Sequence, residues 1–269
     1  PHGDISFLPT YRVSELAARH VKVVLTGDGG DELFAGYTKY RDFFNDASMI
    51  DADLETFQRA YYRNISLFTG DQKPHLYSPQ LRDRLRNSHS YDVVARLYGN
   101  VRHMDRINQA LYLDMMLLLP GNNLVKPDRM GMAVSLEART PFLDYRMMEL
   151  AFRMSGSLKL RNGETKYLYK KAVTPLIGEN LAYRKKQMFT VPVGEWFRKE
   201  MADFPRELLS SKRFIDRGLF EPEAVLDLVN RHRSGEANHT RELRALIAIE
   251  LWFRIFIDAE YQQPPRLSE

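Results

Sequence analysis

The segment TGDGGDE, residues 26–32, places glycines and carboxylates directly after an apolar, β-branched run. Glycines let backbone N–H groups approach a ligand closely, and a helix that starts here would favour an anionic group such as phosphate. Asp28 and Asp31 would repel bare phosphate, whereas a divalent cation between them and the phosphate would reverse that effect. The segment therefore indicates Mg²⁺-bound pyrophosphate. The alternative is that Asp28 or Asp31 only caps the helix while the glycines form the turn.

A second set of charges lies among apolar residues in LVKPDRMGMAVSLEARTPFLD, residues 124–144. Charges placed in this way usually pair with one another or cap helices. Structural ion pairs are therefore favoured over ligand contact, although Glu137 and Arg139 remain candidates for lining a cleft. The residues concerned are Asp128, Arg129, Glu137, Arg139 and Asp144.

A third segment, residues 159–199, carries ten basic and three acidic residues, while the whole chain has a net charge of only +4. Lys166 and Lys170 are spaced to share one helix face, and three further basic residues, Arg184, Lys185 and Lys186, follow a predicted helix end. An anionic ligand could bind here, but a solvated face is the better interpretation for Lys170, Lys171 and Lys185.

Composition excludes several kinds of chemistry. The chain of 269 residues has no cysteine, so it can form neither a disulfide nor a thiolate metal site. Its seven histidines show no zinc-binding spacing, and no long uncharged apolar run predicts a membrane span. The expected setting is cytoplasmic, without a membrane partner. Because basic and acidic residues are interspersed, nucleic-acid binding is not favoured for the chain as a whole.

Several elements must position these residues. A helix over 11–20 should lead into a buried strand over 21–26, after which long helical patterns dominate. Asp105 is expected to cap a helix that ends at Pro120 and Gly121, Asp144 a helix that ends near Gly156, and Thr240 the last helix, which ends before residues 264–265. Because one strand cannot form a sheet, the chain is expected to be the C-terminal part of a longer protein.

Taken in order, these motifs resemble the synthetase domain of glutamine-dependent asparagine synthetases. That family carries a Ser-Gly-(Glu/Asp)-Gly-x-Asp-Glu loop, a Glu-Ala-Arg-x-Pro-Phe-Leu-Asp block, a lysine motif, and Arg-x-Lys-x-Gly-Phe followed by Pro-x-x-x-Trp. The corresponding stretches here are TGDGGDELFAGY, KPDRMGMAVSLEARTPFLD, KYLYKKA, RKKQMF and VPVGEW. The likeness covers roughly residues 4–200.

The resemblance implies a mainly α-helical fold with a small α/β portion. The chain would be the C-terminal part of an adenine-nucleotide α-hydrolase-like (ATP pyrophosphatase) domain with an added helical region. Residues 1–45 would belong to the α/β nucleotide-binding core and residues 46–269 to the helical part. The family's pyrophosphate loop and its glutaminase domain lie upstream of these motifs, so residues 1–269 alone are expected to be inactive. A homodimer is a further expectation.

The implied reaction has two steps: ATP adenylates the side-chain carboxylate of aspartate, and ammonia derived from glutamine displaces AMP to give asparagine. By resemblance, Asp31 would hold Mg²⁺ on the pyrophosphate, Asp28 would act near the attacking amine, and Lys166 would neutralise developing negative charge. The remaining implied nucleotide-binding residues are Gly27, Gly29, Gly30, Arg184 and Lys186.

The sequence departs from the family pattern at Thr26, Pro127 and Met188, where the family usually has Ser, Val and Gly. One alternative is a ligase on the same scaffold, such as a β-lactam synthetase or lasso-peptide cyclase, that activates another carboxylate. The acid at Asp28 favours transfer of ammonia instead. An alternative of another class is a helical RNA- or protein-interaction module that uses the basic segment 159–199.

Overall fold

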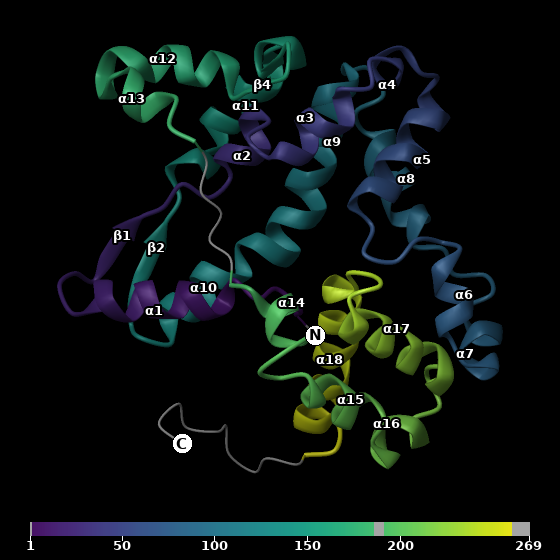
Figure 1. Ribbon diagram of the computed structural model, residues 1–269. Helices are drawn as coiled ribbons and strands as arrows, with labels where there is room; N and C mark the ends of the chain where they lie inside the picture. The colour runs from purple at the N-terminus through teal and green to yellow at the C-terminus, as the bar shows by residue number, and fades with distance from the viewer. Residues whose placement is uncertain (1, 186–190, 260–269) are drawn as a thin grey trace. The chain divides into compact units, whose positions relative to one another are not determined.

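A computed structural model describes residues 2–185 and 191–259. They form two compact units (Figure 1): a larger unit from residues 6–65 and 90–189, and a smaller unit from residues 1–5, 66–89 and 190–269, each as far as it is described. Helices predominate in both, which confirms the prediction of a mainly helical chain. Within the described ranges, no helix has the length and apolar character needed to cross a bilayer.

The larger unit begins with helix α1 and strand β1, and the chain then runs through short helices before returning to pair with β1. Its elements are α1 (Phe7–Ala18), β1 (Val23–Leu25), α2 (Gly30–Phe34), α3 (Thr38–Phe44), α4 (Ser48–Asp51), α5 (Leu54–Ile65), α8 (Ser90–Gly99), α9 (Arg106–Leu113), π-helix η1 (Asp114–Asn123), α10 (Val125–Met132), β2 (Glu137–Arg139), 3₁₀ helix η2 (Pro141–Leu143), α11 (Tyr145–Arg153), 3₁₀ helix η3 (Gly156–Leu158), β3 (Leu160–Arg161), β4 (Glu164–Thr165), α12 (Tyr167–Ile177) and α13 (Glu179–Ala182).

Strand β1 pairs in parallel with β2, and Val24 lies opposite Ala138. The sequence predicts the strand at β1 but not its partner, because the residues of β2 are Glu-Ala-Arg and give no apolar signal. The expectation of a buried strand is wrong: Leu25 is 75% exposed, because no described residues cover the sheet face from which its side chain points. Among the described residues, β1 also has a neighbouring strand on one edge only.

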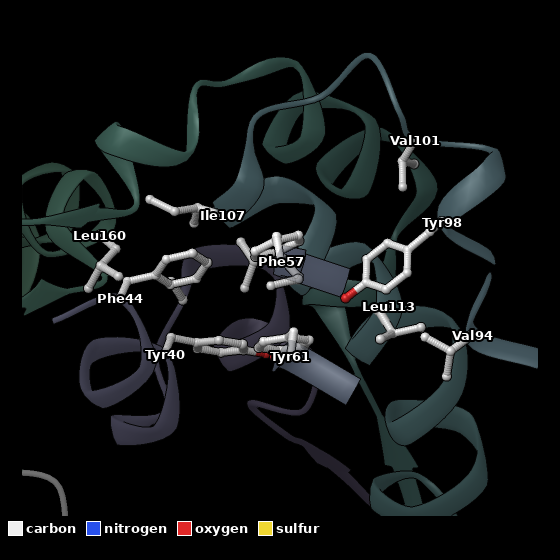
Figure 2. Close-up of a cluster of buried hydrophobic side chains, with 13 residues drawn as sticks. Tyr40, Phe44, Phe57, Tyr61, Val94, Tyr98, Val101, Ile107, Leu113 and Leu160 are labelled. Atoms are coloured by element: carbon white, nitrogen blue, oxygen red, sulfur yellow. The ribbon is translucent and has the colours of Figure 1, made fainter. Parts of the chain in front are cut away.

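The main core of the larger unit is aromatic (Figure 2). Phe57 stacks on Tyr61 with ring centroids 6.2 Å apart, and Tyr40, Tyr61 and Tyr98 are fully buried. A second cluster, made by Leu33, Phe34 and residues from η1 and α11, lies directly behind the glycine-rich loop. Each cluster includes residues of α2, of α3 or of the loop between these two helices. Burial of these side chains therefore holds the segment that follows the glycine-rich loop in place.

Helix caps follow the sequence in two of three cases. Asp105 and Asp144 cap α9 and α11, each accepting a hydrogen bond from a backbone N–H of the first turn. Thr240 is instead the first residue of α18 (Thr240–Phe256), because the side chain of Asn238 accepts the hydrogen bonds from its N–H and hydroxyl. The predicted stop at Pro120 is also wrong: the helix continues through it as η1, whose wider turns tolerate a proline.

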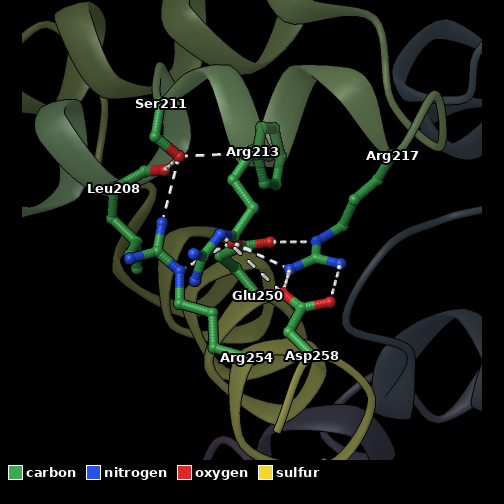
Figure 3. A network of polar contacts seen from close by, with 8 residues as sticks. Leu208, Ser211, Arg213, Arg217, Glu250, Arg254 and Asp258 are labelled. Atoms are coloured by element: carbon green, nitrogen blue, oxygen red, sulfur yellow. Dashed lines mark hydrogen bonds and ion pairs between the residues drawn. The ribbon is translucent and has the colours of Figure 1, made fainter. Parts of the chain in front are cut away.

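The smaller unit is helical, with a core from α15 (Asp203–Leu209), α17 (Pro222–Ser234) and α18. It also contains an ion-pair network around a buried carboxylate (Figure 3). Glu250 is fully buried, and its carboxylate lies 2.6 Å from Arg217 Nε and 2.8 Å from Arg254 Nε. Arg217 also binds Asp258, and this contact lowers the Asp258 pKa. The elements are α6 (Gln72–Leu76), α7 (Pro79–Arg84), α14 (Val193–Trp196), α15 (Asp203–Leu209), α16 (Lys212–Asp216), α17 (Pro222–Ser234) and α18 (Thr240–Phe256).

Candidate functional site

The glycine-rich loop joins β1 to α2. Thr26 Oγ1 donates a hydrogen bond of 2.7 Å to Asp28 Oδ2, which orients that carboxylate. Gly29 has a φ of +86°, and a Cβ there would lie 2.2 Å from Leu143 Cδ2. Its glycine requirement therefore arises from backbone conformation and from packing against η2. Gly27, by contrast, is exposed and has open space beside it.

Asp31, in the first turn of α2, forms an ion pair with Lys166. The distance from Asp31 Oδ1 to Lys166 Nζ is 2.7 Å, and the two side chains are 21% and 29% exposed. A Cβ at Gly36 would lie 1.9 Å from Asp31 Oδ1 and 2.2 Å from Lys166 Cε, so only glycine permits this approach. The structure thus brings together two residues that the sequence singles out in distant motifs.

A β-hairpin delivers Lys166 to this position. Strands β3 and β4 pair in antiparallel fashion, and Asn162 and Gly163 at the turn both have positive φ, as an Asn-Gly hairpin turn requires. Lys166 itself has a φ of +55°, and its N–H donates to the carbonyl of Phe34 in α2. Backbone and side chain together therefore attach this residue to the glycine-rich loop. The Asn-Gly pair is a sequence signal that could have predicted this hairpin, which is not among the elements expected from the sequence above.

Lys159, at the base of the hairpin, is fully buried. Its ammonium donates to Asn108 Oδ1 at 2.7 Å and lies 4.6 Å from the centre of the Phe152 ring. Burial lowers the pKa of Lys159 to about 8, because desolvation disfavours the charged form. Its carbonyl accepts a hydrogen bond from the N–H of Tyr167, the residue that follows Lys166.

Behind Asp31 lies a buried carboxylate that the sequence does not single out. Glu32 is 1% exposed, and its Oε1 accepts hydrogen bonds from Tyr37 Oη at 2.9 Å and Asn123 Nδ2 at 2.7 Å. Burial raises the pKa of Glu32 and, with nearby carboxylates, that of Tyr37. The Asp-Glu pair in the motif is the sequence signal for Glu32. It does not reveal that the Asp31 side chain points to the partly exposed site while the Glu32 side chain is buried.

A second buried carboxylate, Asp114, begins η1. Its Oδ2 accepts hydrogen bonds from Tyr40 at 2.6 Å and Tyr61 at 2.8 Å, and Lys39 Nζ lies 2.6 Å away. Lys39 in turn lies 5.4 Å from the centre of the Tyr37 ring. The first and last residues of η1, Asp114 and Asn123, therefore both contact the segment that follows the glycine-rich loop.

The other candidate residues lie elsewhere. Glu137 and Arg139 pair with each other at 2.9 Å on exposed β2, and Asp128 and Arg129 are exposed neighbours. Arg184 follows α13 and is exposed. Lys186, like Met188, lies outside the described residues. Asp144 combines its cap with an ion pair to Arg146, which lowers the Asp144 pKa to about 2.

The described residues contain no cluster of three or more His, Asp or Glu side chains able to hold a metal ion by themselves. Mg²⁺ is commonly held by one or two carboxylates together with phosphate oxygens and water. Asp31 is partly exposed and offers hard oxygen ligands beside a cation. These groups fit a metal that arrives with a polyphosphate rather than one in an all-protein cage.

Comparisons with known proteins match most or all of the chain. A family model described as asparagine synthase covers residues 1–254. The chain is 29% identical over its full length to asparagine synthetase (glutamine-hydrolyzing) 1 of Bacillus subtilis and 30% identical to a putative asparagine synthetase (glutamine-hydrolyzing) of Mycobacterium bovis. It spans 46% and 44% of those proteins. Amidase chyE of Penicillium rubens is 24% identical to the chain, in an alignment that covers 80% of the chain and 40% of that amidase.

Proposed function

Because the chain belongs to the asparagine synthase family, we propose that the whole protein forms asparagine from aspartate, with ATP as the activating substrate and glutamine as the source of ammonia. The observation that carries this assignment is the Asp31–Lys166 pair beside the glycine-rich loop. A carboxylate and an ammonium 2.7 Å apart can bind the two components of a metal polyphosphate, the cation and the anion.

In the proposed reaction, a side-chain carboxylate oxygen of aspartate attacks the α-phosphorus of ATP, and the bond to pyrophosphate breaks. Ammonia then attacks the acyl carbon, AMP leaves with the bonding electron pair, and the nitrogen loses one proton. Lys166 would neutralise negative charge on the departing phosphate, and Asp28, held by Thr26, would orient the amine or accept its proton. Gly27 would leave room beside the loop for a phosphate.

Mg²⁺ would supply charge neutralisation on the pyrophosphate, and Asp31 is the residue proposed to hold it. Gly29 and Gly30 would keep the loop close to η2, while Arg184 and Lys186 are proposed to face phosphate. No further described strand pairs with β1 or β2, and Leu25 is exposed; both observations support an α/β core of the pyrophosphatase type that extends beyond this chain. A glutaminase domain is the proposed partner that supplies ammonia.

The direct test incubates the whole natural protein with ATP, Mg²⁺, aspartate and either glutamine or ammonium, and measures AMP and asparagine. We expect equal amounts of both products. Parallel reactions replace aspartate with glutamate or with larger carboxylic acids. Formation of AMP with one of these acids but not with aspartate would overturn the choice of substrate. Absence of AMP with every acid would overturn the ligase assignment.

A further inference from the structure

Helix α2 carries Asp31 and Glu32 side by side, and the two carboxylates have different environments. Asp31 points to Lys166 at the partly exposed site, whereas Glu32 is buried and binds Tyr37 and Asn123. Neighbouring helix residues differ in direction by roughly 100°. The burial of one side chain therefore sets the direction of the other.

This helix needs an external anchor. It has only five residues, and left-handed residues, Gly29 and Ala35, flank it at both ends. A helix of that length has little stability of its own and is held by tertiary contacts. Apolar packing of Leu33 and Phe34 buries one side, but apolar contacts are not directional, whereas the hydrogen bonds of Glu32 define a rotation.

We propose that Glu32, Tyr37 and Asn123 act as positioning residues that fix the rotation of α2 and so hold Asp31 against Lys166. Two hydrogen bonds fix the direction of the Glu32 side chain. Its Oε1 accepts one from the loop that follows α2 and one from the last residue of η1. Asn123 Nδ2 also lies 3.0 Å from Tyr37 Oη, so each of the three side chains contacts the other two. The catalytic meaning of this role rests on the proposed function, whereas the positioning itself does not.

The test reads the Asp31–Lys166 pair without catalysis. The whole natural protein is treated with limiting acetic anhydride, and mass spectrometry gives the acetylation rate of Lys166 relative to exposed Lys171. In Glu32→Ala, Lys166 should react about fivefold faster, which corresponds to loss of an ion pair worth roughly 1 kcal/mol. Glu32→Gln keeps an oxygen in the Oε1 position and should leave the rate within about twofold of wild type.

The matched control is Tyr61→Phe, which also removes a buried hydroxyl bound to a carboxylate but acts on Asp114. It should lower the unfolding temperature as much as Tyr37→Phe does, yet only Tyr37→Phe should accelerate acetylation of Lys166. Equal acceleration of Lys166 acetylation in both variants would overturn the proposal, because a general loss of stability would then explain the effect. So would a Glu32→Gln variant that behaves like Glu32→Ala, because the charge would then matter rather than the geometry.

Where Glu32→Ala does not fold, Tyr37→Phe and Asn123→Leu decide the same question, since each removes one of the two donors. Assays of aspartate-dependent AMP formation, run on the same variants, separate the two proposals. If wild type forms no AMP while acetylation responds as expected, the proposed function fails and the positioning role holds. If AMP forms and acetylation of Lys166 is unchanged in every variant of the set, the positioning role fails.

Discussion

Lys166 and Lys159 are close in sequence but have different environments. Lys166 is partly exposed and pairs with Asp31, whereas Lys159 is fully buried against a neutral amide and an aromatic ring. A buried ammonium without a directly bonded carboxylate loses hydration that an amide only partly replaces. The protonation of Lys159 should therefore affect folding stability, whereas Lys166 is the lysine proposed to contact a ligand.

Lys166→Ala in the whole natural protein should lower the rate of AMP formation by at least ~100-fold, the scale of losing one positioned electrostatic donor. Lys171→Ala, in helix α12 directly after Lys166, serves as the control and should retain activity. A loss of less than about threefold for Lys166→Ala would show that its ammonium does not contact developing charge.

The Lys159 pKa predicts a pH-dependent contribution to stability. The lysine has a pKa of about 8 in the folded chain and about 10.4 when unfolded, so between these values the unfolded state binds more protons. Stability contributed by this residue should therefore rise from pH 8 to about pH 10.4, by about 3 kcal/mol in total. Urea unfolding of wild type and Lys159→Met at a series of pH values isolates this term. A constant difference between the two would contradict it.

At the scale of elements, short segments carry most of the site. The β3–β4 hairpin sets the backbone of Lys166, α2 directs Asp31, and η1 supplies contacts from both of its ends. None of these elements is long enough to be stable alone, so each depends on turn geometry or on buried polar contacts. Substitutions at those turns and buried contacts should therefore alter the positions of Asp31 and Lys166 without touching either residue.

Gly163 tests the turn. Its φ is +77°, and an added Cβ would meet only Arg41 Cγ at 3.9 Å, so Gly163→Ala introduces conformational cost without a clash. The unfolding free energy should fall by about 1–2 kcal/mol. Gly70→Ala, which also has open space, is the control and should change it by less than about 0.5 kcal/mol. Equal effects at both positions would show that the left-handed turn is not the cause.

The ion pairs of Glu250 join α18 to the residue that follows α16, and their removal tests how much they stabilise the smaller unit. Glu250→Ala removes a fully buried carboxylate that binds Arg217 and Arg254, which leaves two guanidinium groups without that partner. We expect a loss of about 3–5 kcal/mol in unfolding free energy. Glu236→Ala, which breaks the exposed pair with Arg231, should cost less than about 1 kcal/mol. Chemical denaturation measures both, and a small effect at Glu250 would mean that water replaces it.

At the scale of the whole molecule, the chain spans less than half of the relatives named above. Within the part of the chain that the structure describes, the parallel pair β1–β2 has an open edge. Exposed apolar side chains on β1, Val23 and Leu25, accompany that edge. Unpaired strand edges with apolar side chains promote association. The division into a nucleotide-binding core over residues 1–45 and a helical part over residues 46–269 stays a prediction.

Residues 1–269 expressed alone should show neither ATP–pyrophosphate exchange nor glutamine hydrolysis, and should self-associate through the edge of β1. Sedimentation should detect this association, and Leu25→Lys should reduce it. Aspartate-dependent AMP formation by residues 1–269 would contradict the prediction, because every nucleotide ligand would then have to lie within them.

The sequence by itself determined the family motifs, the mainly helical character, the strand at β1 and the caps at Asp105 and Asp144, because each depends on local residue order. It also singled out Asp31 and Lys166, whose 2.7 Å contact only the tertiary structure decided. Strand β2, the path of η1 through Pro120, and the burial of Glu32, Asp114, Lys159 and Glu250 escaped sequence reasoning. A charged residue has the same local pattern whether it is solvated or buried. Its environment is set by partners distant in sequence, such as Asn123 for Glu32 and Tyr40 and Tyr61 for Asp114.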